Sequence, residues 1–89
     1  MNDIAVSTQM PRYVSHKKVW ALKIEAINYD AAVGSATITP AESGYAPFRV
    51  GAAYVEKHKP QVGGYYVVYD DGYRSFSPAE AFESGYTRI

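Results

Sequence analysis

The sequence predicts an α+β fold, in which a small, mainly antiparallel sheet of about four strands carries two short helices. Three observations lead to this prediction: two alternating segments in the first half, a short segment of helical periodicity in the middle, and a tyrosine-rich strand, turn and helix start near the end. A chain of 89 residues is long enough for one domain. We expect a flexible N-terminal tail over residues 1–12 and a single α+β domain over residues 13–89.

The first two strands are predicted from the alternation of apolar and polar residues. Residues 17–27 (KKVWALKIEAI) place every second side chain on one face, as in a half-buried strand. Residues 28–34 form the turn, and residues 35–39 (SATIT) alternate again until Pro40. The side chains predicted to face inward are Trp20, Leu22, Ile24, Ala26, Ala36 and Ile38. The two segments are therefore expected to pair as an antiparallel hairpin.

The middle of the chain contains a loop, a short strand and a helix. Two prolines and a glycine make residues 40–47 (PAESGYAP) a loop, and residues 48–50 suit a short strand. The segment AAYVEKHK that follows is predicted to form one or two helical turns, because Val50, Ala53 and Tyr54 share a face at i, i+3, i+4 spacing. Lysines near its end complement the helix dipole, and the proline after them ends the helix.

The strongest strand signal is YYVVY, which follows two glycines and runs towards the pair Asp71-Gly72. This pair is predicted to be a two-residue type I′ loop, which requires a positive φ at both positions. In that register Val68 lies opposite Ser75. One face of the hairpin then carries Tyr65, Val67, Tyr69, Arg74 and Phe76, and its apolar members are predicted to face the core. The other face carries Tyr66, Val68, Asp70, Tyr73, Ser75 and Ser77.

A second short helix is predicted directly after this hairpin. Ser77 is the predicted N-cap, Pro78 suits the first helical position, and Glu80 completes a capping box. Gly85 is expected just beyond the last helical residue, at the C′ position, so the helix has about two turns.

The charges are balanced in number but not in position. Nine lysines and arginines match nine aspartates and glutamates, so the formal net charge is +0 and a nucleic-acid partner is disfavoured. Four basic residues lie within residues 12–23, whereas residues 70–83 contain four acidic residues and one arginine. This asymmetry would pair two ends of one fold, or two copies of the chain.

The composition offers no metal or cofactor site. The chain has no cysteine, and His16 and His58 are too few for a metal site, so no metal and no cofactor is predicted. No segment approaches the roughly 20 apolar residues of a membrane span. The first ten residues lack the basic start and apolar run of a signal peptide. We expect a cytoplasmic protein that does not contact a membrane.

No catalytic arrangement is predicted either. Ser75 and Ser77 have no histidine nearby in the sequence to act as a base. Asp70 and Asp71 would suit a divalent cation, but a turn explains the pair better. Residues 57–59 (KHK) would hold a phosphate, but a solvated helix end explains them better. We therefore expect a protein that is not an enzyme.

The hairpin has more apolar surface than one small core can cover. Tyr66, Val68 and Tyr73 are left on the second face, and tyrosine is enriched at interfaces. The simplest cover for such a face is a second copy of the chain in a two-fold dimer. Aromatic rings beside cations and a helix N-terminus also suit a nucleobase that carries a phosphate.

The C-terminal third resembles a group of uncharacterised small accessory proteins of tailed bacteriophages. They share the motif GY-x-V-x-Y-x-DGY-x-S-aromatic-SP-x-x-x-FE-x-x-Y, and residues 63–88 (GGYYVVYDDGYRSFSPAEAFESGYTR) are similar to it. The opening strand KKVWALKI is similar in a weaker way, and residues 28–60 do not match. Phe76 stands where the group is expected to have Trp. The resemblance implies a phage origin and brings no activity, catalytic residue or ligand.

The function expected from these observations is that of a non-catalytic, phage-type accessory binding protein in the cytoplasm of a bacterial host cell. The sharper expectation is counter-defence, by sequestering a small anionic host molecule such as a nucleotide immune signal. The alternative is a protein–protein inhibitor that blocks a host enzyme or defence complex through the tyrosine-rich surface. The expected partners are the chain itself, as a homo-oligomer, and such a ligand or host protein. The predicted ligand-binding residues are Tyr66, Tyr73, Arg74, Ser75, Lys59 and Tyr86.

Overall fold

The computed structural model describes residues 18–88 and shows an α+β fold, as predicted, with five strands and two short helices. The predicted tail over residues 1–12 lies outside the described residues. The elements in chain order are β1 (Val19–Asp30), β2 (Ser35–Pro40), β3 (Phe48–Val50), α1 (Ala52–His58), β4 (Tyr65–Tyr69), β5 (Arg74–Ser77) and α2 (Ala79–Gly85). The number of strands is one more than the predicted four.

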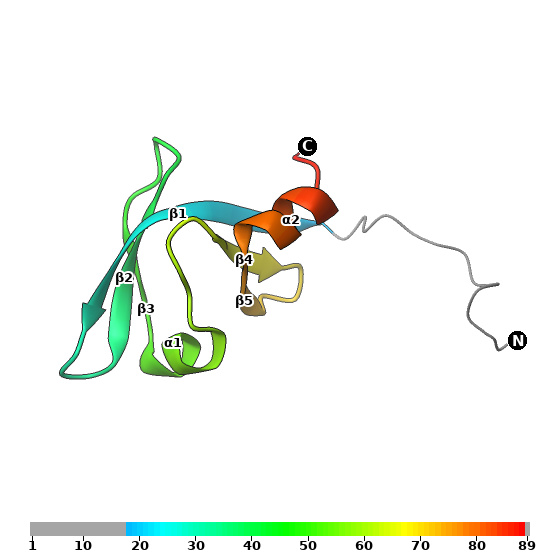
Figure 1. The fold of residues 1–89 in the computed structure, drawn as a ribbon. Coiled ribbons are helices and arrows are strands. Elements are labelled where there is room, and N and C mark those ends of the chain that lie inside the picture. The colour runs from blue at the N-terminus through cyan, green and yellow to red at the C-terminus, as the bar shows by residue number, and fades with distance from the viewer. Residues whose placement is uncertain (1–17, 89) are drawn as a thin grey trace, which may run out of the picture.

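All five strands form one antiparallel sheet in the order β3-β2-β1-β4-β5. The first three strands follow one another, and β4 returns to lie beside β1, which makes the connection a Greek key. With a fifth strand and a helix between β3 and β4, this is the arrangement of an OB-fold, a partly open five-stranded barrel. In Figure 1 α1 lies below β1, whereas α2 overlaps the right-hand part of β1 in this view.

The long strand β1 joins the two parts of the sheet. Its first part, from Val19 to Lys23, pairs with β4, and its second part, from Ile24 to Asp30, pairs with β2. The buried core lies along the second part. Its members are Ile24, Ala36, Ile38 and Val50, each at most 1% exposed. Ala36 and Ile38 therefore face inward as predicted, and the predicted β1–β2 hairpin is confirmed.

The predicted inward face of β1 is wrong at both ends. Trp20 is 64% exposed, although it shares the face of buried Ile24, because the core ends before the strand does. An irregularity between Ile24 and Ala26 shifts the register, so Ile27 takes the inward position opposite Ile38. Simple alternation had assigned that position to Ala26.

The β4–β5 loop has three residues, not two, so the predicted type I′ turn is wrong. The Tyr69 N–H donates to the Tyr73 carbonyl (2.9 Å), and the Gly72 N–H donates to the Tyr69 carbonyl (2.8 Å). Gly72 alone in this loop has a positive φ, 88°, as in a turn closed by a bulge. Val68 consequently lies opposite Arg74 rather than Ser75.

This difference of one residue moves every β5 side chain to the other face of the sheet. One face of the hairpin now carries Tyr66, Val68, Arg74 and Phe76. The other carries Tyr65, Val67, Tyr69, Ser75 and Ser77. Tyr66, which was expected to be left over, packs against the core together with Phe76, and its ring lies 4.6 Å from that of Phe48.

The predicted capping box of the second helix is also wrong. The N-cap of α2 is Pro78, and no side chain of residues 18–88 caps the helix. The Ser77 hydroxyl donates to the Pro78 carbonyl instead (3.3 Å). Ser77 remains in β5, paired with Tyr65, so its backbone belongs to the sheet. At the other end Gly85 is the last helical residue, and the C-cap is Tyr86 in an extended conformation, so the predicted C′ glycine is wrong.

Candidate binding site at the β4–β5 turn

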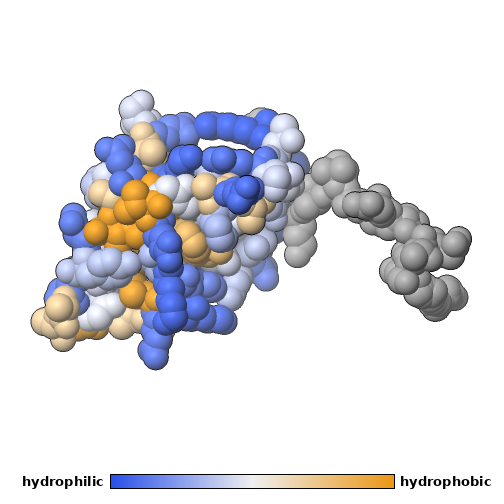
Figure 2. Space-filling model, viewed as in Figure 1, coloured by the Kyte–Doolittle hydropathy of each residue, from blue (hydrophilic) through white to orange (hydrophobic). Residues whose placement is uncertain are grey.

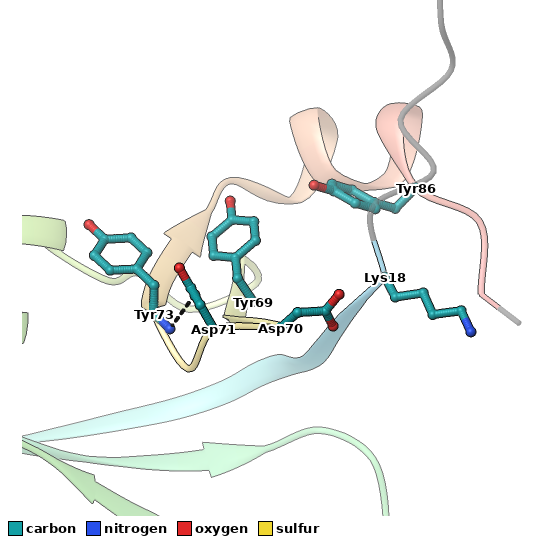
Figure 3. A pocket seen from close by; sticks show the side chains of 6 residues that line it. All are labelled: Lys18, Tyr69, Asp70, Asp71, Tyr73 and Tyr86. Atoms are coloured by element: carbon teal, nitrogen blue, oxygen red, sulfur yellow. Dashed lines mark hydrogen bonds between the residues drawn. The ribbon is translucent and has the colours of Figure 1, made fainter.

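An open hollow of about 460 Å³ lies beside the β4–β5 turn (Figure 3). It is lined by Lys18, Tyr69, Asp70, Asp71, Tyr73 and Tyr86. The turn itself supplies the two aspartates and two of the tyrosines, the end of α2 supplies Tyr86, and the residue before β1 supplies Lys18. The hollow therefore depends on three segments that are distant in the sequence.

The turn holds its tyrosines in a fixed arrangement. The Asp71 carboxylate accepts the Tyr73 N–H (2.9 Å), which stabilises the loop. The rings of Tyr69 and Tyr73 stack with their centroids 6.0 Å apart. Figure 3 shows these two rings side by side, whereas the ammonium group of Lys18 points away from them. The hollow thus has aromatic walls and two carboxylates, and its one lysine extends outward.

Helix α2 is attached to the hairpin by aromatic stacking. The ring of Phe82 stacks on Tyr65 at 4.2 Å and on Tyr86 at 4.6 Å. These contacts cover the Tyr65 face of the sheet and place Tyr86 at the hollow. Offset aromatic pairs of this kind contribute roughly 0.5–1.5 kcal/mol beyond the area that they bury.

A charged contact adds to this attachment. The Glu83 carboxylate accepts hydrogen bonds from the Tyr65 hydroxyl (2.7 Å) and from the Lys23 ammonium (3.0 Å). These bonds lower the pKa of Glu83 and raise the pKa values of Tyr65 and Lys23. The charge asymmetry was expected to pair either two ends of one fold or two copies of the chain. The Lys23–Glu83 pair is of the first kind.

Helix α1 packs against the other side of the hairpin. The Tyr54 hydroxyl donates to the Ser75 carbonyl (2.7 Å), and burial raises the pKa of Tyr54. The Lys57 ammonium lies 5.3 Å from the centre of the Tyr73 ring. His58 contacts the same ring, and burial, followed by the charge of Lys57, lowers its pKa. The edge strand β5 is thereby partly covered, which protects it from pairing with other chains.

A second feature lies at the same end of the molecule, on the sheet face that α2 does not cover. Trp20 lies opposite Val68, and Val68 lies opposite Arg74, so the three side chains form a row across β1, β4 and β5. We call them the Trp20 row. Trp20 is largely exposed, and Arg74 forms no ion pair or hydrogen bond with residues 18–88.

The structure brings together only two of the six residues predicted to bind a ligand. Tyr73 and Tyr86 both line the hollow. Tyr66 packs in the core, Arg74 lies in the Trp20 row, and Ser75 is on the face that carries Val67. Lys59 is the C-cap of α1, and its ammonium donates to the Glu56 carbonyl (3.1 Å).

Sequence reasoning missed Trp20 as a surface residue. Alternation assigned it to the core, and only one signal argued otherwise: Lys18 lies two residues earlier, on the same face of an extended chain. A lysine at that position indicates that this end of the face meets solvent. Asp70 and Asp71 were interpreted as turn residues in preference to a cation site, and the structure places both beside the hollow as well.

The described residues contain no assembled metal centre and no membrane-spanning helix. Within residues 18–88, no three His, Cys, Asp or Glu side chains come together as metal ligands. No helix in that part of the chain has the length and apolar character needed to cross a bilayer.

The fold and these surfaces define a small Greek-key barrel with exposed aromatic side chains at one end. Among solved structures, the chain is similar to the monomeric form of the phage L decoration protein, whose structure was determined by NMR in solution. The two share 35% sequence identity with a TM-score of 0.65, over 83% of this chain and 54% of that protein. The chain thus spans about half the length of the phage L protein.

No protein-family model and no curated protein matches the chain. The likeness to the phage L protein involves sequence as well as fold, so the chain is a small phage-related protein. The similarity confirms the phage relationship that the C-terminal motif implied.

Proposed function

We propose that the chain is a non-catalytic binding protein that attaches to the surface of a phage capsid. The observation that carries this proposal is the similarity to the phage L decoration protein over 83% of the chain. A decoration protein acts by binding to an assembled capsid, which requires an exposed interface and no catalytic group. In this role the chain acts on the surface of the virion and not in the host cytoplasm, which was the location expected from the sequence.

The surface chemistry supports this role. Interface centres are enriched in Trp, Tyr and Arg and depleted of Lys and Glu, and the exposed Trp20 and Tyr73 lie at one end of the molecule with Arg74. The formal net charge of +0 gives no general attraction to nucleic acid. Self-association remains a prediction, with Val68 and Tyr73 available for it and Tyr66 occupied in the core.

The test is co-sedimentation of the purified chain with capsids of the phage that encodes it, and with phage L capsids that lack their decoration protein. We expect saturable binding to capsids and none to unassembled capsid protein. If the chain stays in the supernatant with both kinds of capsid, the proposed function is wrong. Retention of a single host enzyme instead would favour the protein–protein inhibitor.

Capture of a small anionic molecule, such as a nucleotide, is the second candidate. The hollow favours it because Tyr73 and Tyr86 offer rings on which a base would stack. The charges oppose it, since Asp70 and Asp71 face the same hollow and would repel a phosphate. A thermal-shift screen with nucleotides and cyclic dinucleotides tests it, because a ligand that binds the native state raises Tm. An unchanged Tm throughout the screen would remove this candidate.

A further inference from the structure

We infer that the chain binds the capsid through the Trp20 row. The partner surface on the capsid is then a protein surface with an apolar socket bordered by carboxylates. This inference rests on the proposed function and adds to it a named surface and the chemistry of the partner. The geometry, the exposure and the charges of the row each support it.

The row is rigid because it is built on three neighbouring strands. Trp20 and Val68 are directly paired, as are Val68 and Arg74, so all three side chains leave the same face of the sheet. With strands about 4.8 Å apart, the row extends about 10 Å across the sheet. A sheet holds side chains in place at a lower entropic cost of binding than a mobile loop does.

The row is the uncovered continuation of the core face. On the same face, Ile24 is 1% exposed and Tyr66 packs against Phe48, whereas Trp20 is 64% exposed. The opposite face at this end is already covered by α2 through Tyr65 and Phe82. An exposed Trp at the end of a packed sheet face is chemically suited to enter a socket on a partner.

The charges around the row indicate that the partner surface carries acidic groups. Arg74 lies at one end, and Lys18 precedes Trp20 by two residues at the other. Neither cation forms an ion pair within residues 18–88. Acidic groups on the partner would satisfy both, and such complementarity fixes the orientation of docking. Trp and Arg are also the residue types that most often dominate binding energy.

A single-stranded nucleic acid is the competing partner, since it too is bound by aromatic rings beside cations. The row contains one cation, Arg74, and Lys18 adds a second beside it, whereas Asp70 and Asp71 follow β4 at the same end of the molecule. A phosphate chain crossing this end would meet those carboxylates. The charges therefore favour a protein with localised carboxylates over a continuous polyanion.

The test measures capsid binding of two variants and two matched controls in the full chain. Trp20→Ala is expected to weaken binding at least about 30-fold, as for a hot-spot residue, and Arg74→Gln about 10-fold. The controls are Tyr45→Ala, at a residue that is 53% exposed in the β2–β3 loop, and Arg88→Gln, at a residue after α2 whose guanidinium pairs with the Glu42 carboxylate. Both controls are expected to bind within about threefold of the unmodified chain.

The outcomes separate this inference from the proposed function. If the unmodified chain binds capsids and Trp20→Ala binds equally well, the inference is wrong and the proposed function stands. If the unmodified chain does not bind, the proposed function itself fails. Should Trp20→Ala not fold, Arg74→Gln and Arg74→Glu decide, because the Arg74 side chain is exposed and forms no ion pair within residues 18–88.

The nucleic-acid alternative has its own readout, because Trp20 is the only tryptophan in the chain. Stacking of a base on its ring would quench the intrinsic fluorescence during titration with an oligothymidine, and salt would reverse the effect. No change in fluorescence is expected. Salt-sensitive quenching that matches binding would overturn the choice of a protein partner.

Discussion

The two halves of the sheet are stabilised in different ways. In the aliphatic half, which comprises the second part of β1 with β2, β3 and α1, four small aliphatic side chains are almost completely buried. The aromatic half comprises the first part of β1 with β4, β5 and α2. Among its described residues, Val67 is the one hydrophobic side chain that is buried to a similar degree. Ring stacking and the contacts of Glu83 hold that half together.

This difference separates stability from binding. On the face drawn in Figure 2, the strongly apolar residues that reach the surface, in orange, lie mostly on the side of the molecule where Figure 1 places β2 and β3. The aromatic half exposes Trp20 and Tyr73 at one end, beside the charged groups that line the hollow. Rings that contact neighbours with one side and solvent with the other are suited to meet a partner. The aliphatic half is thus the scaffold, and the aromatic half carries the candidate binding surfaces.

The largest effect is expected from a change in the aliphatic half. Ile38→Ala should lower the free energy of unfolding by about 2–5 kcal/mol, because it leaves a cavity at a completely buried position. Trp20→Ala, which removes a much larger side chain, should change it by less than about 0.5 kcal/mol, as surface substitutions do. Urea denaturation of both variants measures this. A larger loss for Trp20→Ala would break the distinction between the two halves.

The next effect concerns the turn in the aromatic half. Gly72→Val should destabilise the fold by at least about 1–2 kcal/mol, because φ is 88° and a β-branched residue resists that conformation. Gly85→Ala is the matched control, since a glycine in a helix without a positive φ gains from replacement. Its Tm should stay equal or rise. Tolerance of Gly72→Val in a thermal melt would refute the three-residue loop.

A smaller effect is expected from the charged contact that holds α2. The pKa of Glu83 lies below its ordinary value of 4.5, so its contribution to stability is present above that pH and is lost as the pH falls through the lowered pKa. Glu83→Gln should therefore lower Tm at pH 7 but not at pH values below the lowered pKa. Glu25→Gln, on the exposed side of β1, is the control and should show no such difference. An equal loss at both pH values would exclude ionisation as the cause.

The smallest effect is expected at the start of α2. Ser77→Ala should change stability by less than about 0.5 kcal/mol, because the Ser77 side chain does not cap the helix. A true N-cap would give a loss of roughly 0.5–2 kcal/mol. A loss in that range, measured by urea denaturation, would restore the capping box predicted from the sequence.

The aliphatic half was the easier to predict from the sequence, and the reason is physical. Residues such as Ala36 and Ile38 alternate with polar ones, and that period alone determines which side is buried. In the hairpin both faces are apolar, so the pattern does not determine the register. Asp71-Gly72 suits both a two-residue and a three-residue loop, and backbone bonds around Tyr69 decide between them.

The candidate site was only partly predictable for a related reason. Alternation shows that Trp20 and Ile24 share a face, but it does not show how far the cover over that face extends. That limit is set by where β3 and α1 end in space, which depends on long-range packing. Tyr73 and Tyr86 meet at the hollow because α2 folds back over the hairpin, and the Tyr65–Phe82 stack that directs this is not visible as a pattern.

The most direct test of the capsid contact through the aromatic half is hydroxyl-radical footprinting of the chain, free and bound to capsids, read out by mass spectrometry. Trp20 and Tyr45 are both more than half exposed, so both are open to oxidation in the free chain. We expect oxidation of Trp20 to fall strongly on binding and oxidation of Tyr45, in the aliphatic half, to stay unchanged. Protection of Tyr45 with Trp20 still fully oxidised would contradict this expectation, and would place the capsid contact on the aliphatic half.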